Sequence, residues 1–556
     1  MAGPRRQARC IGWATALLLA IPRIAYALEP AAEPEPTTEP TTEPPPSEDA
    51  PSDVEALRQR VEALEQQVRE LEAEGDTTTE PPPAPEPAVP APKEPKVDPS
   101  TAAPKHKVQP GEVEENRPPD YASGFHFGSY GRVVSGADAK GRPGRDGDIV
   151  AYGSRLDEST YAELELRRED YWEKTGAYTR VVATVAFAHP VFHYDANFDA
   201  NFGVRNLYLE ETGLGLEKLS VWAGSRMYRG DDIYLLNVWP LDNLNTIGGG
   251  LSYTFLTDLT LKLHAGINQP DHPFFLQTGQ RPLPLGLLGE TQVRINDRQK
   301  FISSARLSNI FWLGKTGGIK PVLYGEVHYT SEAQQEVTDQ RFETLPDDVG
   351  FLVGTQIGLF TGKRSTHLNL VFRYAGGLAA YGEFNAPTQL NPDRTSKGAR
   401  EMLVALSGNY EVGPFGLLAA SYWRQFRNAS PNLDYADLGE GIVVLRPTVW
   451  FGEIAGLSVE GSYQAQRRGV LLPQSDGSAI PQFGQMGRVG IVPFLTPAGR
   501  GSYARPHIRL IYLLSLRDEG ARRLYAQHDV FGLRTVDHFI GFGAEWWFNS
   551  SSYFRD

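Results

Sequence analysis

Cysteine is nearly absent from this chain of 556 residues. The single cysteine, Cys10, lies in a segment that has the basic residues, the apolar run Ile11–Ile21 and the small-residue cleavage site of a secretory signal. Residues 1–27 are therefore predicted to be a signal peptide. Once this peptide is removed, the chain would have no cysteine, which excludes disulfides, cysteine-based zinc sites and a lipid anchor on cysteine.

Long apolar runs are missing beyond the signal peptide, and basic residues are outnumbered. No stretch of about 18 apolar residues follows residue 27, so no membrane-spanning helix is expected. Lys and Arg number 54 against 68 Asp and Glu, a formal net charge of −14 that argues against a nucleic-acid partner. The mean hydropathy of −0.36 fits a soluble protein. A transmembrane β-barrel has a similar average, because only alternate residues of its strands face lipid.

Three segments without a globular pattern follow the signal peptide. Residues 28–53 are rich in Glu, Pro and Thr and cannot bury enough apolar surface to fold, so they are expected to be disordered. Residues 54–74 predict a coiled coil that makes the protein oligomeric, with a solvated amphipathic helix as the alternative. Three heptads place valine at position a and leucine at position d: Val54, Val61, Val68, Leu57, Leu64 and Leu71. Residues 75–120 form a second proline-rich stretch, predicted to be a semi-extended linker.

From residue 121 to residue 556 the pattern changes to an alternation of apolar and polar residues. Leu368, Leu370 and Phe372 fall on one face of such a run, and His367 and Arg373 fall on the other. Short turns alternate with longer loops, as in outer-membrane barrels. This length gives about 24 residues per strand and connection for 18 strands, and sixteen strands would also fit. We predict an all-β fold, an antiparallel transmembrane β-barrel, with a soluble sandwich or propeller as the alternative.

The sequence carries none of the common catalytic or nucleotide-binding motifs. It has no H-E-x-x-H, no G-x-S-x-G, no P-loop and no G-x-G-x-x-G after a strand, so we expect neither an enzyme nor a cofactor. Asp195, Asn197 and Asp199 have the spacing of the start of a calcium-binding EF-hand loop. The required glycine and the final glutamate are missing, so a polar loop without a metal is the better interpretation.

Alternation also predicts which residues face the inside of the barrel. It places Tyr130 with Arg132, Tyr161 with Glu163, and Trp547 with Glu545 on inner faces. A sugar ring has an apolar face that stacks on aromatic rings and a rim of hydroxyl groups that match charged donors and acceptors. An inner surface that mixes aromatic and charged residues therefore indicates a sugar path.

Four short motifs carry a resemblance to a known family. They are Ser129–Arg132 followed by Ser135-Gly136, Thr160–Leu164, Trp222–Tyr228, and Ala504–Arg509. Together they resemble the maltoporin family of outer-membrane carbohydrate porins, and the layout is similar to the sucrose-porin branch, which carries an N-terminal coiled coil. The resemblance is scattered over residues 121–548. It implies a trimeric barrel of 18 strands with a file of aromatic residues, the greasy slide, flanked by polar tracks at a constriction.

The resemblance also implies the residues that bind the solute. The positions that match the slide are Tyr130, Tyr161, Trp239 and Trp547, and those of the polar tracks are Arg132, Arg155, Glu163, Arg205 and Asp242, with Arg229 beside them. The chain departs from the family where Trp239 replaces a tyrosine, Asn237 an aspartate, Tyr234 a histidine and Gly230 an arginine. The aromatic residue that a neighbouring subunit contributes is either Tyr194 or Phe198. These departures leave the class of sugar open.

The prediction is a porin of the bacterial outer membrane for facilitated, energy-independent diffusion of maltodextrin-type or sucrose-type oligosaccharides. Its expected partners are the sugar, outer-membrane lipid and two further copies of the chain, with the coiled coil in the periplasm near a binding protein or peptidoglycan. One alternative is an anion or dicarboxylate porin, in which Arg132, Arg155 and Arg205 form a positive ladder. Another is a soluble secreted lectin or adhesin held together by the coiled coil.

Overall fold

The computed structural model describes residues 123–140, 147–154, 156–157, 160–188, 201–255, 258–283, 287–361, 366–432, 436–473, 479–526 and 528–550. The predicted signal peptide, disordered segment, coiled coil and linker lie outside these ranges. So do Arg155, Tyr194, Phe198 and most of the stretch that is similar to an EF-hand loop. Predictions that concern these residues stay predictions. All the described residues belong to one compact unit, Pro104–Asp556.

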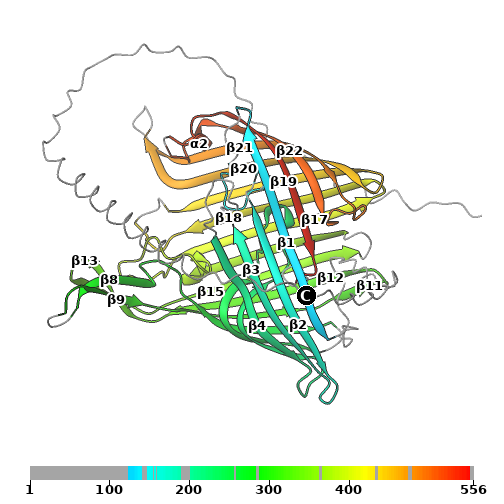
Figure 1. Ribbon diagram of the computed structural model, residues 1–556. Helices are drawn as coiled ribbons and strands as arrows, with labels where there is room; N and C mark the ends of the chain where they lie inside the picture. Colours follow the sequence, from blue (N-terminus) through cyan, green and yellow to red (C-terminus); the bar gives the residue numbers. More distant parts are fainter. Residues whose placement is uncertain are drawn as a thin grey trace, which may run out of the picture. The chain divides into compact units, whose positions relative to one another are not determined.

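Nineteen strands form one continuous antiparallel sheet that closes on itself. They are β1 (Gly124–Asp138), β2 (Tyr161–Trp172), β3 (Ala177–Ala188), β4 (Asn201–Thr212), β5 (Leu219–Arg229), β6 (Asn243–Thr254), β7 (Thr260–Asn268), β10 (Lys300–Ser308), β11 (Phe311–Leu313), β12 (Gly317–Thr330), β15 (Asp348–Thr361), β16 (Thr366–Gly377), β17 (Arg400–Val412), β18 (Phe415–Arg427), β19 (Leu438–Phe451), β20 (Ala455–Pro473), β21 (Ala479–Leu495), β22 (His507–Arg517) and β23 (Val536–Phe548). The first strand pairs with the last, side by side in Figure 1. Because β10 and β11 pair with β12 one after the other, they count as one strand of the wall, and the barrel has 18 strands.

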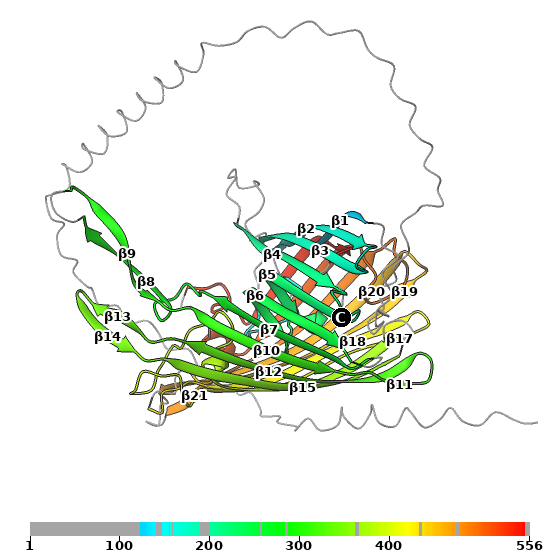
Figure 2. The ribbon, with the colours of Figure 1, turned by 90° about the horizontal axis from the view of Figure 1, so that it is seen from below.

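The connections differ in length at the two ends of the barrel. Connections such as 173–176, 213–218 and 314–316 are short, and we name the end where they lie the turn end. The opposite end, the loop end, has long connections such as 269–299 and 378–399. Two hairpins belong to it, β8 (Leu276–Pro282) with β9 (Glu290–Asp297) and β13 (Ala333–Thr338) with β14 (Arg341–Leu345). In Figure 2 the β8–β9 hairpin projects well beyond the barrel wall. The predicted alternation of turns and loops is confirmed.

The two faces of each strand differ as the alternation predicts. On β2, Glu163 is fully buried, whereas its neighbour Leu164 is 44% exposed on the outside. On β23, Phe542 and Phe548 are exposed outside while Glu545 is buried inside. An outer surface of apolar side chains around a closed antiparallel sheet is the pattern of a membrane barrel, so the sandwich and propeller alternatives are wrong.

Two segments from the loop end fold into the barrel and form part of its core. Residues 147–157 contribute Ile149 and Val150, and residues 230–242 contribute Leu235 and Leu236 from the 3-10 helix η3 (Tyr234–Leu236). The other short helices among the described residues are η4 (Leu378–Tyr381) and α2 (Glu519–Arg522). Within the described ranges, no helix has the length and apolar character needed to cross a membrane. The inward segments narrow the inside of the barrel.

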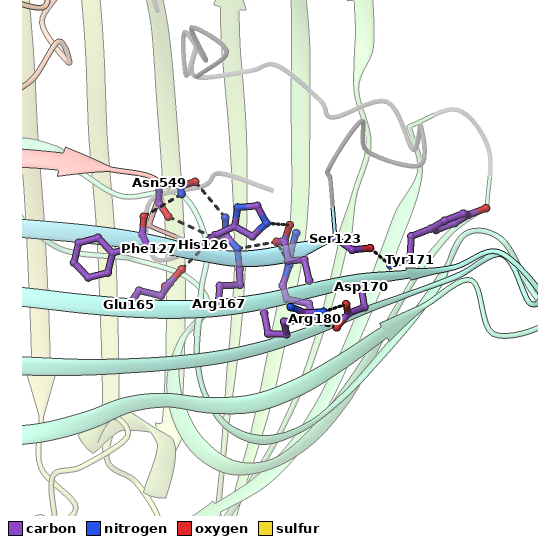
Figure 3. Close-up of polar contacts among 11 residues, drawn as sticks. Ser123, His126, Phe127, Glu165, Arg167, Asp170, Tyr171, Arg180 and Asn549 are labelled. Atoms are coloured by element: carbon purple, nitrogen blue, oxygen red, sulfur yellow. Dashed lines mark hydrogen bonds and ion pairs between the residues drawn. The ribbon is translucent and has the colours of Figure 1, made fainter. Parts of the chain in front are cut away.

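The seam between the ends of the sheet is fixed by polar contacts at the turn end. The backbone turns at Asn549, whose φ of 50° is left-handed, and the side-chain amide of Asn549 donates to the carbonyl oxygen of Phe127 at 3.0 Å. Arg167 on β2 donates to the amide oxygen of Asn549 at 3.2 Å and to Glu165 at 3.1 Å, as Figure 3 shows. The chain after the last strand therefore turns over the inner wall, and Ser550 is buried there.

Candidate functional site

Aromatic rings from β1, β2 and β23 and from η3 form a file inside the barrel. The ring centroids of Tyr161 and Tyr130 are 5.9 Å apart, and those of Tyr130 and Trp547 are 6.4 Å apart with nearly parallel planes. Tyr234 meets Trp547 edge to face at 6.0 Å. The register explains the order, because Tyr130 pairs with Trp547 and Arg132 pairs with Tyr161. Three of the four predicted slide residues are thus neighbours.

Charged groups flank the end of this aromatic file at which Tyr161 lies. The Tyr161 hydroxyl donates to the Glu163 carboxylate at 2.5 Å, and Arg205 on β4 pairs with the same carboxylate. The Arg205 guanidinium also lies 5.5 Å from the centre of the Tyr161 ring. Arg132 is buried on β1 directly opposite Glu545 of β23. Three predicted polar-track residues, Arg132, Glu163 and Arg205, therefore lie beside the predicted slide.

The other predicted residues form a second group on the inward segment 230–242. The Arg229 guanidinium lies 3.4 Å from the centre of the Trp239 ring. Asp242 is 3.5 Å from Arg306 of β10, and Asp231 is 3.2 Å from Lys320 of β12. These contacts tie the segment to the wall opposite β1. The predicted residue Arg155 is outside the described ranges and cannot be placed in either group.

A cluster at the turn end was not predicted from the sequence. Arg505, in the connection 496–506, donates to Glu545 at 2.7 Å, bonds the Tyr234 hydroxyl and lies 4.3 Å from the centre of the Trp547 ring. Burial lowers the pKa of Arg505, but the charge of Glu545 outweighs burial and holds this pKa above its ordinary value. The motif Ala504–Arg509 was recognised, yet it gave no sign that its arginine contacts the aromatic file.

A ladder of charges on the far wall was also missed. Arg373 on β16 is 2.9 Å from Glu401 on β17, which is 2.5 Å from Arg424 on β18, and Arg424 is 3.2 Å from Glu440 on β19. Each residue was visible as an inward-facing charge, but the pairing depends on the register between strands. Continuous rows of donors and acceptors across four strands can bind hydroxyl groups one after another.

Arg488 of β21 fixes the other inward segment. It is 2.6 Å from Asp157 and pairs with Asp148, so one guanidinium holds two carboxylates of residues 147–157. Burial raises the pKa of Asp157 although Arg488 opposes this effect. Among the residues that the structure describes, no three His, Cys, Asp or Glu side chains are grouped so that they could hold a metal ion.

Comparisons with known proteins identify a family but little beyond it. The family description LamB porin matches residues 125–548. Three solved outer-membrane proteins have a similar chain path. OmpT of Vibrio cholerae in its trimer form is 11% identical, with 77% of this chain and 100% of that chain covered and a TM-score of 0.34. OpdK of Pseudomonas aeruginosa is 11% identical, with 76% and 99% covered and a TM-score of 0.35, and Wzi of Escherichia coli is 10% identical, with 75% and 83% covered and a TM-score of 0.35. A search of curated proteins found no match.

Proposed function

The chain belongs to the LamB porin family and is an outer-membrane porin, and from this premise we propose that its solutes are sugars. They are oligosaccharides of the maltodextrin or sucrose type, which cross by facilitated diffusion without an energy source. The short connections of the turn end face the periplasm in this proposal, and the long connections face the outside.

The aromatic file is the observation that carries the proposal. The rings of Tyr161, Tyr130, Trp547 and Tyr234 follow one another with centroids about 6 Å apart, and a sugar chain can move from one to the next. Movement requires that each station bind well enough to attract the sugar and weakly enough to release it. Glu163 and Arg205 beside Tyr161 can exchange hydrogen bonds with the hydroxyl rim of the sugar while one face stacks.

The inward segment 230–242 narrows the path in this proposal. It brings Trp239, Asp242 and the η3 residue Tyr234 into the barrel, and its contacts with Lys320 and Arg306 keep it there. Trp239 and Asp242 are buried. They act at the constriction, where Trp239 limits the width and Asp242 with Arg229 contributes polar groups.

The assembly and the N-terminal segments extend the proposal. We propose a homotrimer, with the coiled coil of residues 54–74 in the periplasm on the linker of residues 75–120. Contact of the coiled coil with a periplasmic binding protein or with peptidoglycan stays a prediction.

The anion-porin alternative has less support. Arg205 pairs with Glu163, so a carboxylate offsets the charge of this arginine of the proposed ladder. The soluble lectin or adhesin alternative conflicts with membership in a porin family.

The conductance of the purified protein in a planar bilayer tests the proposal. The expected result is a conductance that changes in groups of three equal steps and that maltooligosaccharides or sucrose block with a saturable constant. The sugar that blocks more tightly identifies the solute as maltodextrin-type or sucrose-type. Anion-selective conductance that neither sugar affects would favour the anion porin. A protein that forms no channel would contradict both.

A further inference from the structure

A pocket lies at the turn end, between the connection 496–506 and the inner faces of β18 to β22. It is a small pocket that is partly open to solvent. Three arginines line it, Arg446 from β19, Arg505 from the connection and Arg509 from β22, and no carboxylate is among the described residues of its lining. The pocket is therefore a positively charged cavity in a buried part of the barrel.

Three side chains of this lining have nitrogen atoms that lack a partner among the described residues. They are Trp450 Nε1, His507 Nε2 and Arg509 Nε. The three residues are only 3%, 8% and 6% exposed. An indole N–H and a guanidinium N–H can only donate, and leaving a buried donor unsatisfied costs about 1–3 kcal/mol. Two obligate donors of the lining, on Trp450 and Arg509, therefore lack an acceptor, which points to an occupant that brings one.

The carboxylates nearest to these arginines leave part of the positive charge uncompensated. Arg446 Nε donates to Glu460 at 2.6 Å, and Arg509 Nη1 donates to Glu545 at 3.3 Å. Arg505 shares the same Glu545. Three guanidinium groups therefore face two carboxylates, and neither carboxylate lines the pocket. An occupant with a negative charge would balance the set.

Packing holds the donor groups in place before any occupant arrives. Any side chain at position 416 of β18 would overlap the ring of Trp450, so a glycine is required there for the indole to occupy its place. The imidazole of His507 stacks on Phe494 with ring centroids 4.3 Å apart. A rigid set of donors binds an oxyanion with little loss of side-chain entropy.

We propose that this pocket binds one oxyanion, a phosphate or carboxylate group. The group comes either from a small acidic solute in transit or from a free inorganic anion, and both present several acceptor oxygens to Trp450, Arg509 and Arg446. The proposal does not rest on sugar transport, because its test measures anion binding alone. The pocket adjoins the aromatic file, since Arg505 of its lining also contacts Tyr234 and Trp547.

Titration calorimetry of the full-length, detergent-purified protein at neutral pH tests this site. The probes are inorganic phosphate, glucose 6-phosphate and, as the neutral control, glucose. The variants are Trp450→Phe, which removes one N–H and keeps an aromatic ring, and Arg509→Lys, which keeps the charge and removes the fork of donors. The matched control is Trp423→Phe, because Trp423 lies on the outer face of β18. Heat-modifiable migration of each folded barrel on a gel controls for folding.

Saturable binding of an anionic probe that each pocket variant weakens about fivefold or more, with Trp423→Phe unchanged, is the expected result. Binding of both phosphate and glucose 6-phosphate identifies a free-anion site, and binding of glucose 6-phosphate alone identifies the acidic group of a solute. Absence of binding by either anion, equal binding of glucose, or anion binding that the pocket variants leave unchanged overturns the proposal. Block of conductance by neutral sugars is independent of each of these outcomes.

Discussion

Replacement of Tyr161 by alanine should weaken sugar binding without reducing ion flow. The Tyr161 ring is the station of the aromatic file that lies next to both Tyr130 and the pair of Glu163 with Arg205. Truncation removes one stacking surface from the path and leaves the charged pair in place. Because the ring also occupies space inside the barrel, its removal should leave the conductance equal or larger.

The size of the effect follows from the geometry. An aromatic contact of this kind contributes about 0.5–1.5 kcal/mol beyond the area that it buries. A loss of about 1 kcal/mol corresponds to a roughly fivefold weaker block constant. Tyr161→Phe is the matched control, because it keeps the ring and removes only the hydroxyl that donates to Glu163 at 2.5 Å. That variant should stay within about twofold of the wild type, since Arg205 still holds the carboxylate.

The assay is the block of single-channel current by a maltooligosaccharide or by sucrose, whichever binds the wild type more tightly. An unchanged block constant in Tyr161→Ala, together with a smaller conductance, would refute the assignment of this ring to the sugar path. Equal losses in the alanine and phenylalanine variants would show that the hydroxyl, rather than the ring face, is what the sugar uses.

Three further predictions concern the segments that shape the barrel interior. Burial raises the pKa of Glu383 to about 7, so this carboxyl keeps its proton at pH values where an unfolded one ionises. The loop 378–399 should therefore lose at most about 3 kcal/mol of stability as pH rises from about 4.5 to 7. In Glu383→Gln, hydrogen exchange in this loop should follow only the pH dependence of the intrinsic exchange rate. A wild-type loop equally protected at pH 5 and pH 8 would contradict this. Arg488→Met should leave the buried Asp148 and Asp157 without the cation that they share, at a cost of about 3–5 kcal/mol, and expose residues 147–157 to limited proteolysis. Cleavage no faster than in the wild type would count against this prediction. Asp231→Asn should loosen segment 230–242 and increase the noise of the open-channel current, and a current as quiet as that of the wild type would show that other contacts suffice.

Alternation and a few motifs were enough to predict the barrel wall. The two-residue period separates Leu164 from Glu163 whatever the neighbouring strands do, so the inner and outer faces follow from local sequence. The same rule, added to the family resemblance, placed Tyr130, Tyr161 and Trp547 on inner faces, and the structure puts them side by side.

What sequence could not predict depends on register and on connections that enter the barrel. Arg373 and Glu401 meet because of the stagger between β16 and β17, which no local pattern encodes. Arg505 reaches Trp547 because the connection 496–506 brings it to the ring, which the motif Ala504–Arg509 alone does not encode. Trp239 was predicted as part of the slide, yet its described partner is Arg229 on the adjoining strand.

The order of the strands has a consequence for how the barrel assembles. Among the described strands of the barrel, each pairs with its neighbour along the chain, at most one hairpin away, except at the seam where β1 meets β23. The entropy cost of closing a connection grows with its length, so every pairing but the seam can form locally and in succession. The seam joins residues about 400 positions apart and should be the last to form. The hydrogen bonds of Asn549 with Phe127 and Arg167, just past the final strand, can then form only in the closed barrel and stabilise the closed state.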